Sequence, residues 1–325
     1  MRKWVLPEYV DDILPAEAER IEGLRRRLLD HFRDHGYRLV QPPLIEHLES
    51  LLTGTGHDLE LQTFKLVDPL SGRLLGVRAD ITPQVARIDA HLLNESGVTR
   101  LCYAGSVLRA IASGVAQSRE VLQIGAELYG DPDIGADKEV LTLLLSSLEA
   151  AEVRALHLDL GHVGVYRALA QGARISGNDS DTELFTAMRT KDVAAVTELT
   201  ARLPAAWRDA FLILPTLYGP ADDVLAAARA RLPDTPSIAG ALSALATLAA
   251  VTRDSVEALH IDLADLRGYH YQNGVSFSVF TAGEPNAIGR GERYDGIGKA
   301  FGRARPATGF TLDLRQIAAL GNRSA

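Results

Sequence analysis

The stretch Ser106–Gly130, SVLRAIASGVAQSREVLQIGAELYG, has the pattern of a β-hairpin with a long, polar connection. In its second half two rows of side chains alternate and therefore point to opposite faces of a strand. One row is Leu122, Ile124, Ala126 and Leu128, and the other is Arg119, Gln123, Gly125 and Glu127. The second row predicts a binding face, on which the bare Gly125 would let a ligand approach the strand. The alternative is a solvated outer face of an antiparallel sheet.

Outward from this hairpin, the chain alternates between helix and strand signals. Apolar spacing and Pro15 predict a first helix that ends at Gly36, and Thr82 is expected to cap a helix whose first residue is Pro83. A further helix is expected over 137–153. The expected strands are 37–47 (broken by a Pro-Pro pair), 64–68, 74–78, 100–109, 119–130, 156–161, 258–263, 269–280 and 308–314.

The sequence changes in character between 163 and 258, where alanine and leucine dominate and prolines mark the breaks. We expect a helical insertion there, between two parts of one core formed by residues 1–162 and 259–325. Successive hairpins with segregated helices favour the α+β class over a doubly wound parallel sheet.

Composition excludes several classes of protein. The net charge of −8 and the pI near 5.6 argue against a tight nucleic-acid binder. Cys102 is the only cysteine, which excludes an intramolecular disulfide and a thiolate metal cluster. The histidines show no metal-ligand spacing, and no cofactor motif is complete. We find no apolar leader and no run of about 18 apolar residues, so we expect a cytoplasmic protein without membrane contact.

Three further segments are candidates for chemistry. Arg78 and Asp80 precede a helix start, where Asp80 and Thr82 can equally be ordinary helix-starting residues. Arg267 precedes a glycine at a strand entry and can bind a carboxylate or phosphate in a bidentate way, through two guanidinium N–H groups, or lie at an exposed strand start. The glycine-rich segment 288–303 lacks the order of a P-loop and indicates turns beside a strand.

Taken in order, these segments resemble the catalytic core of the class II aminoacyl-tRNA synthetases, and of histidyl-tRNA synthetase in particular. Segment 36–47 (GYRLVQPPLIEH) is similar to the dimer-forming motif 1, 107–130 to motif 2, and 306–317 (PATGFTLDLRQI) to motif 3. The segments GVRADITPQVAR (76–87), LRGYHYQNG (266–274) and GERYDG (291–296) are similar to loops of the histidyl enzyme. The resemblance implies a class II synthetase-like antiparallel sheet flanked by helices.

The resemblance also implies a histidine pocket. Its residues are Asp80, Thr82, Arg109, Gln123, Glu127, Arg267 and Tyr271. Asp80 stands where the family's glutamate binds the α-amino group, and Gln123 and Glu127 match the strand pair that holds the substrate. Arg267 matches the arginine beside the substrate carboxylate, and Tyr271 matches a pocket tyrosine.

The departures from the synthetase pattern concern ATP. Arg109 keeps the motif 2 arginine that grips the α-phosphate, but Ile111 replaces a glutamate and Ala116–Gln117 replace a glycine-arginine pair. Gln316 stands in place of the motif 3 arginine for the γ-phosphate. Arg315 is its neighbour, but one step along a helix turns a side chain by about 100°. Adenylation needs fixed cations at the phosphates, so we expect no ligase chemistry and no catalytic residues.

This pattern resembles the synthetase-like regulatory subunits of ATP phosphoribosyltransferase, a family that lacks the anticodon-binding domain. The chain ends soon after motif 3, in keeping with that expectation. The resemblance implies a homodimer within a hetero-oligomer, a short-form catalytic subunit as partner and histidine as a feedback ligand, with no cofactor, metal or nucleic acid. Three alternatives remain: an active histidyl ligase, a ligase that loads amino acids onto another carrier, and a structural dimer without a ligand.

Overall fold

The computed structural model describes residues 5–54, 57–112, 118–175, 177, 179–268 and 272–320. The chain forms two compact units. Unit 1 comprises Met1–Arg154, Phe280–Gly291 and Asp295–Ala325, and unit 2 comprises Ala155–Val279 and Glu292–Tyr294. The strands β10 (Val275–Thr281) and β11 (Gly289–Arg293) each contribute residues to both units.

The larger sheet of unit 1 contains the predicted hairpin. Its strand order is β1-β5-β6-β12-β11, where β1 is Arg38–Leu39, β5 is Thr99–Leu108, β6 is Glu120–Tyr129 and β12 is Ala307–Asp313. Strands β5, β6 and β12 are antiparallel, whereas β1 runs parallel to β5, so the sheet is mixed. The α+β prediction is confirmed, and 113–117, within the hairpin connection, lie outside the described residues.

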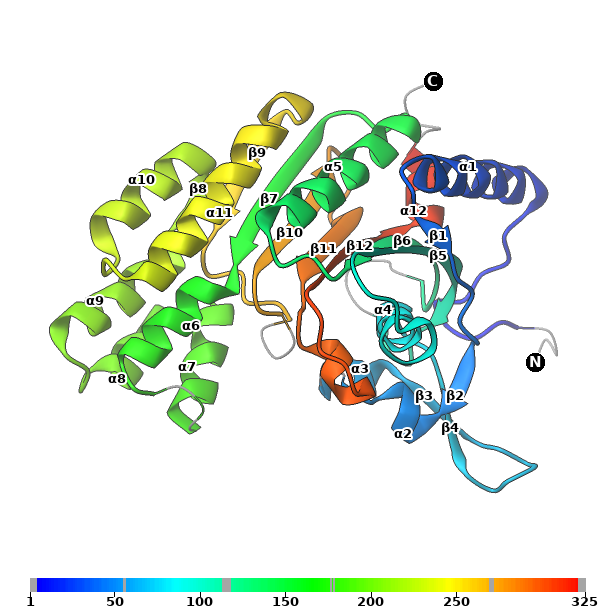
Figure 1. Ribbon diagram of the computed structural model, residues 1–325, viewed down its shortest axis with the longest axis horizontal. Helices are drawn as coiled ribbons and strands as arrows, with labels where there is room; N and C mark the ends of the chain where they lie inside the picture. Colours follow the sequence, from blue (N-terminus) through cyan, green and yellow to red (C-terminus); the bar gives the residue numbers. More distant parts are fainter. Residues whose placement is uncertain are drawn as a thin grey trace. The chain divides into compact units, whose positions relative to one another are not determined.

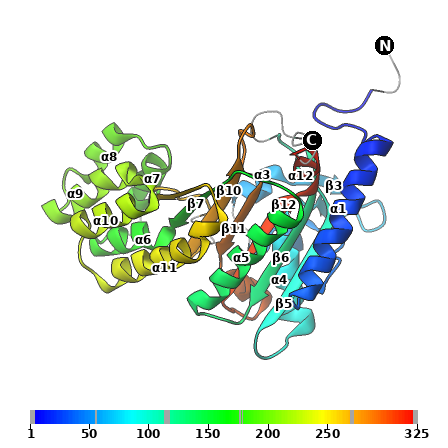
Figure 2. The same ribbon diagram turned by 90° about the horizontal axis from the view of Figure 1, so that it is seen from above.

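The alternation along β6 separates two faces of this sheet, as predicted. Ile124 and Ala126 pair with Leu312 and Phe310 of β12 on the face that three helices cover. These helices are α1 (Pro15–Asp34), α5 (Ile134–Ala150) and α12 (Leu314–Leu320). Their ribbons lie along the sheet in Figures 1 and 2. The ring of Phe32 in α1 meets the ring of Phe310 edge-on, with 5.8 Å between the ring centroids. The opposite face of β6 carries Gln123, Gly125 and Glu127.

A smaller sheet of unit 1 has the order β2-β4-β3. Its strands are β2 (Ile45–His47), β3 (Phe64–Val67) and β4 (Leu74–Val77), and the neighbouring helices are α2 (Leu48–Leu51) and α3 (His57–Gln62). The pair Pro42–Pro43 separates β1 from β2, so the motif 1 segment enters both sheets. Helix α2 covers one face closely, because a Cβ at Gly76 would lie 2.6 Å from the side chain of Leu51.

The start of helix α4 (Thr82–Arg87) corrects one prediction. Thr82 is the first helical residue and not the N-cap, which is Ile81. The carboxylate of Asp80 accepts a hydrogen bond from the backbone N–H of Ile81, and the hydroxyl of Thr82 is used elsewhere. Helix α4 continues into a π-helical turn, η1 (Ile88–Leu93), and the 3₁₀ turn η4 (Ile297–Phe301) packs against both.

Unit 2 has the strand order β10-β7-β9-β8, with β7 parallel to β9. Its strands are β7 (Leu156–His162), β8 (Tyr218–Pro220) and β9 (Ala258–Asp262), and its longer helices are α6 (Val163–Gly172), α7 (Asp179–Arg189), α8 (Val193–Thr200), α9 (Ala205–Ile213), α10 (Ala221–Arg231) and α11 (Pro236–Thr252), joined by the 3₁₀ turns η2 (Leu214–Thr216) and η3 (Arg253–Ser255). His162 caps α6, because its Nδ1 accepts a hydrogen bond from the N–H of Gly164. Burial lowers the pKa of His162 to about 4, which keeps the ring neutral. None of the helices described in either unit has the length and apolarity to cross a bilayer.

Candidate ligand-binding site

The polar row of β6 is buried. Gln123 is 2% exposed and Glu127 is 1% exposed, so this row is not a solvated outer face. The residues just before and at the start of α4 form hydrogen bonds with both side chains. A buried amide and carboxylate need partners, because burial of an unpaired polar group is costly. The first question is therefore which groups satisfy them.

Glu127 is held by two hydroxyl groups. Thr82 Oγ1 donates to Glu127 Oε1 at 3.0 Å, and Tyr103 Oη donates to the same oxygen at 3.1 Å. The two hydroxyl oxygens are themselves 3.3 Å apart. Burial, together with the nearby charge of Glu127, raises the pKa of Tyr103 well above its usual value, so the phenol keeps its proton and remains a donor.

Gln123 and Asp80 form a second hydrogen-bonded pair. Gln123 Nε2 donates to Asp80 Oδ1 at 3.0 Å, and Gln123 Oε1 accepts from the N–H of Ile81 at 3.1 Å. The same N–H also donates to Asp80 Oδ1 at 2.8 Å. The shared backbone donor fixes both side chains relative to the start of α4.

Two glycines of this face make room for protein side chains. A Cβ at Gly125 would lie 2.5 Å from Tyr103 Oη, because Tyr103 is the cross-strand partner of Gly125 and covers it. The expectation that Gly125 leaves the strand bare for a ligand is therefore wrong. A Cβ at Gly309, opposite Glu127 on β12, would coincide with the carboxylate of Glu127. Glycine at both positions lets the network close.

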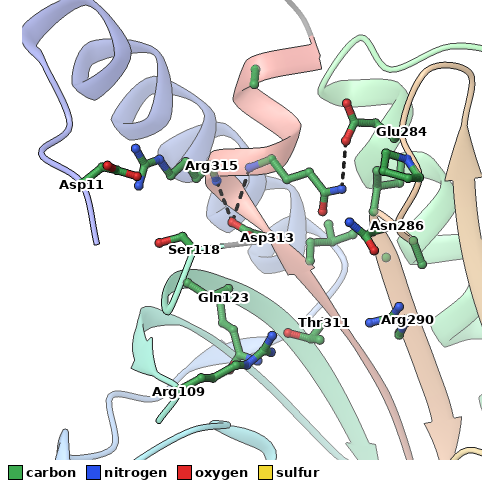
Figure 3. Close-up of a pocket in the computed structure, with 18 of the residues that line it drawn as sticks. Asp11, Arg109, Ser118, Gln123, Glu284, Asn286, Arg290, Thr311, Asp313 and Arg315 are labelled. Carbon is green, nitrogen blue, oxygen red and sulfur yellow. Dashed lines mark hydrogen bonds between the residues drawn. The ribbon is translucent and has the colours of Figure 1, made fainter. Parts of the chain in front are cut away.

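Gln123 also lines a cavity of about 440 Å³ in unit 1 (Figure 3). Its charged lining residues are Asp11, Glu17, Glu284, Asp313, Arg109, Arg290 and Arg315. The four carboxylates and three guanidinium groups give this lining a formal charge of −1. Within the part of the chain that the structure describes, the buried Nε of Arg109 has no hydrogen-bond partner.

The motif 3 positions occupy one side of this cavity (Figure 3). Arg315 Nε donates to Glu17 Oε1 at 3.1 Å, which neutralises its guanidinium within the protein. Gln316 Nε2 donates to Glu284 Oε2 at 3.3 Å. The carboxylate of Asp313 accepts from the N–H groups of Arg315 and Gln316, yet burial raises its pKa.

The structure thus brings four of the predicted residues together at the start of α4, in two neighbouring hydrogen-bonded groups, and Arg109 shares a cavity with Gln123. Arg267 lies in unit 2, where its guanidinium contacts Asp265 through Nε at 2.7 Å and a terminal nitrogen at 2.5 Å, and also Ser278. Tyr271 lies outside the described residues. Sequence reasoning missed Tyr103. The signal that could have found it is the pairing of Tyr103 with Gly125 across β5 and β6, which requires the register of the two strands.

Metal binding finds no support among these side chains. Across the described ranges, no group of three or more His, Cys, Asp or Glu residues has the geometry to hold a metal ion. Cys102 is buried, and burial raises the pKa of its thiol to about 12, so this thiol is unreactive.

Comparison with known proteins gives the same family by several routes. The histidyl-tRNA synthetase family model matches residues 9–317. A relative from Ralstonia nicotianae, named ATP phosphoribosyltransferase regulatory subunit, is 60% identical over 98% of this chain and 82% of its own length. A relative of that name from Thiobacillus denitrificans is 58% identical over the full length of both chains.

Solved structures agree with these relatives. An ATP phosphoribosyltransferase regulatory subunit/histidyl-tRNA synthetase from Bacillus halodurans superposes with a TM-score of 0.85, at 25% identity, over 98% of this chain and 83% of its own. Histidyl-tRNA synthetase from Nostoc superposes with a TM-score of 0.78 over all of this chain and 77% of its own, and at 19% identity it shows the fold alone. The chain therefore belongs to the family of histidyl-tRNA synthetase-like regulatory subunits of ATP phosphoribosyltransferase.

Proposed function

We propose that this chain is a non-catalytic, cytoplasmic subunit that regulates a short-form ATP phosphoribosyltransferase in the first step of histidine biosynthesis. The observation that carries the proposal is the contrast between two neighbouring parts of one site. The buried network around Glu127 keeps groups suited to an amino acid, while the charged side chains that line the adjoining cavity have a net negative formal charge. The identity of the partner enzyme is inferred from the relatives, which are named as regulatory subunits of ATP phosphoribosyltransferase.

The network suits the cationic groups of histidine. Asp80 and Glu127 are carboxylates that can bind an ammonium or a protonated imidazole, and Gln123 offers a donor and an acceptor. The assignment of Arg267 and Tyr271 to the same ligand remains a prediction from the resemblance. Histidine bound there would regulate the enzyme through a difference in its affinity for two states of the complex.

The cavity opposes the use of ATP. A nucleoside triphosphate carries several negative charges, which need fixed cations, but the described lining has a formal charge of −1. Glu17 engages Arg315, and Gln316 brings no charge. These contacts favour a regulatory role over the two ligase alternatives, both of which need a working adenylation site.

The direct test uses the short catalytic subunit of the same organism. We expect its phosphoribosyltransferase activity to rise at least ~5-fold when this chain is added, since coupling between sites is typically 1–3 kcal/mol, which is about 5–150-fold. Added histidine should suppress that activity. If this chain neither binds nor activates the subunit, the proposal fails, and histidine-dependent exchange of pyrophosphate into ATP would then favour the ligase alternative.

A homodimer is part of this proposal, and an exposed apolar face supports it. The register of β2-β4-β3 places Ile45, Leu66, Leu75 and Val77 on one face, opposite the face that α2 covers. Ile45 is 47% exposed and Leu66 is 38% exposed. Such a face is typical of an interaction surface.

The composition of this face fits a second copy of the chain. The register places no Asp, Glu, Lys or Arg of β2, β3 or β4 on it, and Lys65, opposite Gly76, lies on the side that α2 covers. A face without charged side chains can meet its own copy across a twofold axis without charge repulsion. We therefore assign this face to the homodimer.

Leu66→Glu should dissociate the dimer. A carboxylate on this face meets its own copy across the axis, and like charges juxtaposed at an interface cost several kcal/mol, so the dimer Kd should rise at least ~10-fold. Light scattering after size exclusion measures the change. Leu92→Glu is the control, since Leu92 is 62% exposed elsewhere in unit 1. An L66E dimer that no longer activates the catalytic subunit would instead assign this face to that subunit.

A further inference from the structure

We infer that Tyr103 is a positioning residue, whose hydroxyl orients the Glu127 carboxylate toward the cationic group of bound histidine. The inference rests on the proposed histidine binding and adds to it a residue that the resemblance does not supply. Its basis is the contact between Tyr103 Oη and Glu127 Oε1, at 3.1 Å inside a fully buried part of unit 1.

The geometry gives Tyr103 a directional role. Two hydroxyl groups, those of Tyr103 and Thr82, reach the same carboxylate oxygen from different elements, β5 and α4. Both are donors to that oxygen, so Oε1 is engaged by the protein. Hydrogen bonds from two elements to one oxygen restrict rotation of the carboxylate. A carboxylate held in one orientation is preorganised for a cationic ligand.

The backbone around Tyr103 is adapted to this contact. Tyr103 lies opposite Gly125, where any larger residue would collide with the phenol oxygen. Gly309 on the other side leaves the space that the carboxylate of Glu127 occupies. Two glycines within β-strands weaken the sheet, because glycine loses more conformational freedom than other residues on folding. Their presence at these two positions indicates that the sheet is shaped around the pair of Tyr103 and Glu127.

The chain offers a matched control for a test of Tyr103. Tyr37 is also buried, and its hydroxyl donates to a glutamate, Glu139, at 2.9 Å. Glu139 lies on α5, outside the network around Glu127. Tyr37→Phe and Tyr103→Phe therefore each remove a hydrogen bond between a buried tyrosine and a glutamate of unit 1, part-buried for Glu139 and buried for Glu127, but only the second concerns the ligand site.

We expect Tyr103→Phe to weaken histidine binding about tenfold in an NMR titration of the full chain, a method that reaches millimolar Kd. Tyr37→Phe should leave the Kd within about twofold of the wild-type value. Urea midpoints should fall by similar amounts in both variants. Equal losses of affinity in the two variants would show a general structural effect and overturn the inference.

A double-mutant cycle separates positioning from a direct or global role. If Tyr103 acts through Glu127, Tyr103→Phe should change the Kd less than about twofold in a Glu127→Gln background. A tenfold effect in that background would overturn the inference. A wild-type chain that binds no histidine would overturn the proposed sensing and this inference together, whereas a Tyr103→Phe variant with wild-type affinity overturns this inference alone.

Discussion

Glu127→Gln is expected to weaken histidine binding by roughly a hundredfold, which is about 3 kcal/mol and within the 2–5 kcal/mol typical for loss of one partner from a buried charge pair. The amide is uncharged and cannot balance a cationic group of the ligand. Its carbonyl oxygen can still accept the two hydroxyl protons that Glu127 Oε1 accepts from Thr82 and Tyr103, so the substitution removes the charge and not these hydrogen bonds. Calorimetry on the isolated chain and histidine inhibition of the complete complex both measure the change.

The appropriate control is Glu120→Gln, at the start of the same strand. Glu120 is partly exposed and pairs with Leu108, away from the network. This variant should bind histidine like the wild type, and both variants should activate the catalytic subunit. If Glu127→Gln keeps full sensitivity to histidine, the retained network is vestigial, and histidine must act on the catalytic subunit or where the two proteins meet.

The alternation along β6 was sufficient to predict the two faces of the central sheet. Side chains alternate with a period of two residues, so the positions of Gln123 and Glu127 on one face followed directly. The role of Gly125 did not follow, because it depends on which residue of β5 stands opposite. The register of β5 and β6 places Tyr103 opposite Gly125. This register could not be read from the sequence, because the connection between the two strands is long and does not fix which residues pair.

The helix start at Thr82 shows a second limit of local reasoning. The sequence of Asp80, Thr82 and Pro83 has the composition of an ordinary cap, and the local rule assigns the Thr82 hydroxyl to the backbone. The structure directs that hydroxyl to Glu127, 45 residues away in sequence. A tertiary contact with a buried carboxylate prevails over a local cap, because the carboxylate would otherwise lose a donor.

The net negative formal charge of the cavity lining could also not be predicted from short stretches of sequence. The substitution of Gln316 for an arginine could be seen in the sequence, but the carboxylates that face it come from distant segments. Glu17 lies on α1 and Glu284 between β10 and β11, and each contacts a residue of α12. Only the fold brings these charges together. The resemblance could therefore indicate that an arginine is missing at position 316, but not that Glu17 and Glu284 face α12.

Arg305→Ala is expected to lower the free energy of unfolding by about 3–5 kcal/mol at pH 7, the range for breaking a buried ion pair on one side. Arg305 is 8% exposed, and its Nη1 lies 2.7 Å from Oδ1 of Asp89, which is itself buried. The same nitrogen reaches Thr99 Oγ1 at 3.3 Å. The variant leaves the carboxylate of Asp89 in the interior without its counter-charge. Urea denaturation with an unchanged m-value measures the loss.

The pH dependence of this loss identifies its cause. Burial raises the pKa of Asp89 even with Arg305 present, although Arg305 acts in the opposite direction. Without Arg305 the largest effects that oppose burial are lost, and only Thr99 and Arg303 still lower the pKa of Asp89. The pKa therefore rises further, and the protonated form is favoured in the folded state. The loss of stability should therefore be largest at neutral pH and shrink as the pH falls and Asp89 takes up a proton.

Arg303→Ala is the control. It removes a guanidinium two residues away that donates to Asn94 at the surface, and it should lower the free energy of unfolding by less than about 1 kcal/mol. Equal losses in the two variants, or a loss in Arg305→Ala that does not change with pH, would mean that packing of the Arg305 side chain, and not its charge, stabilises this part of unit 1.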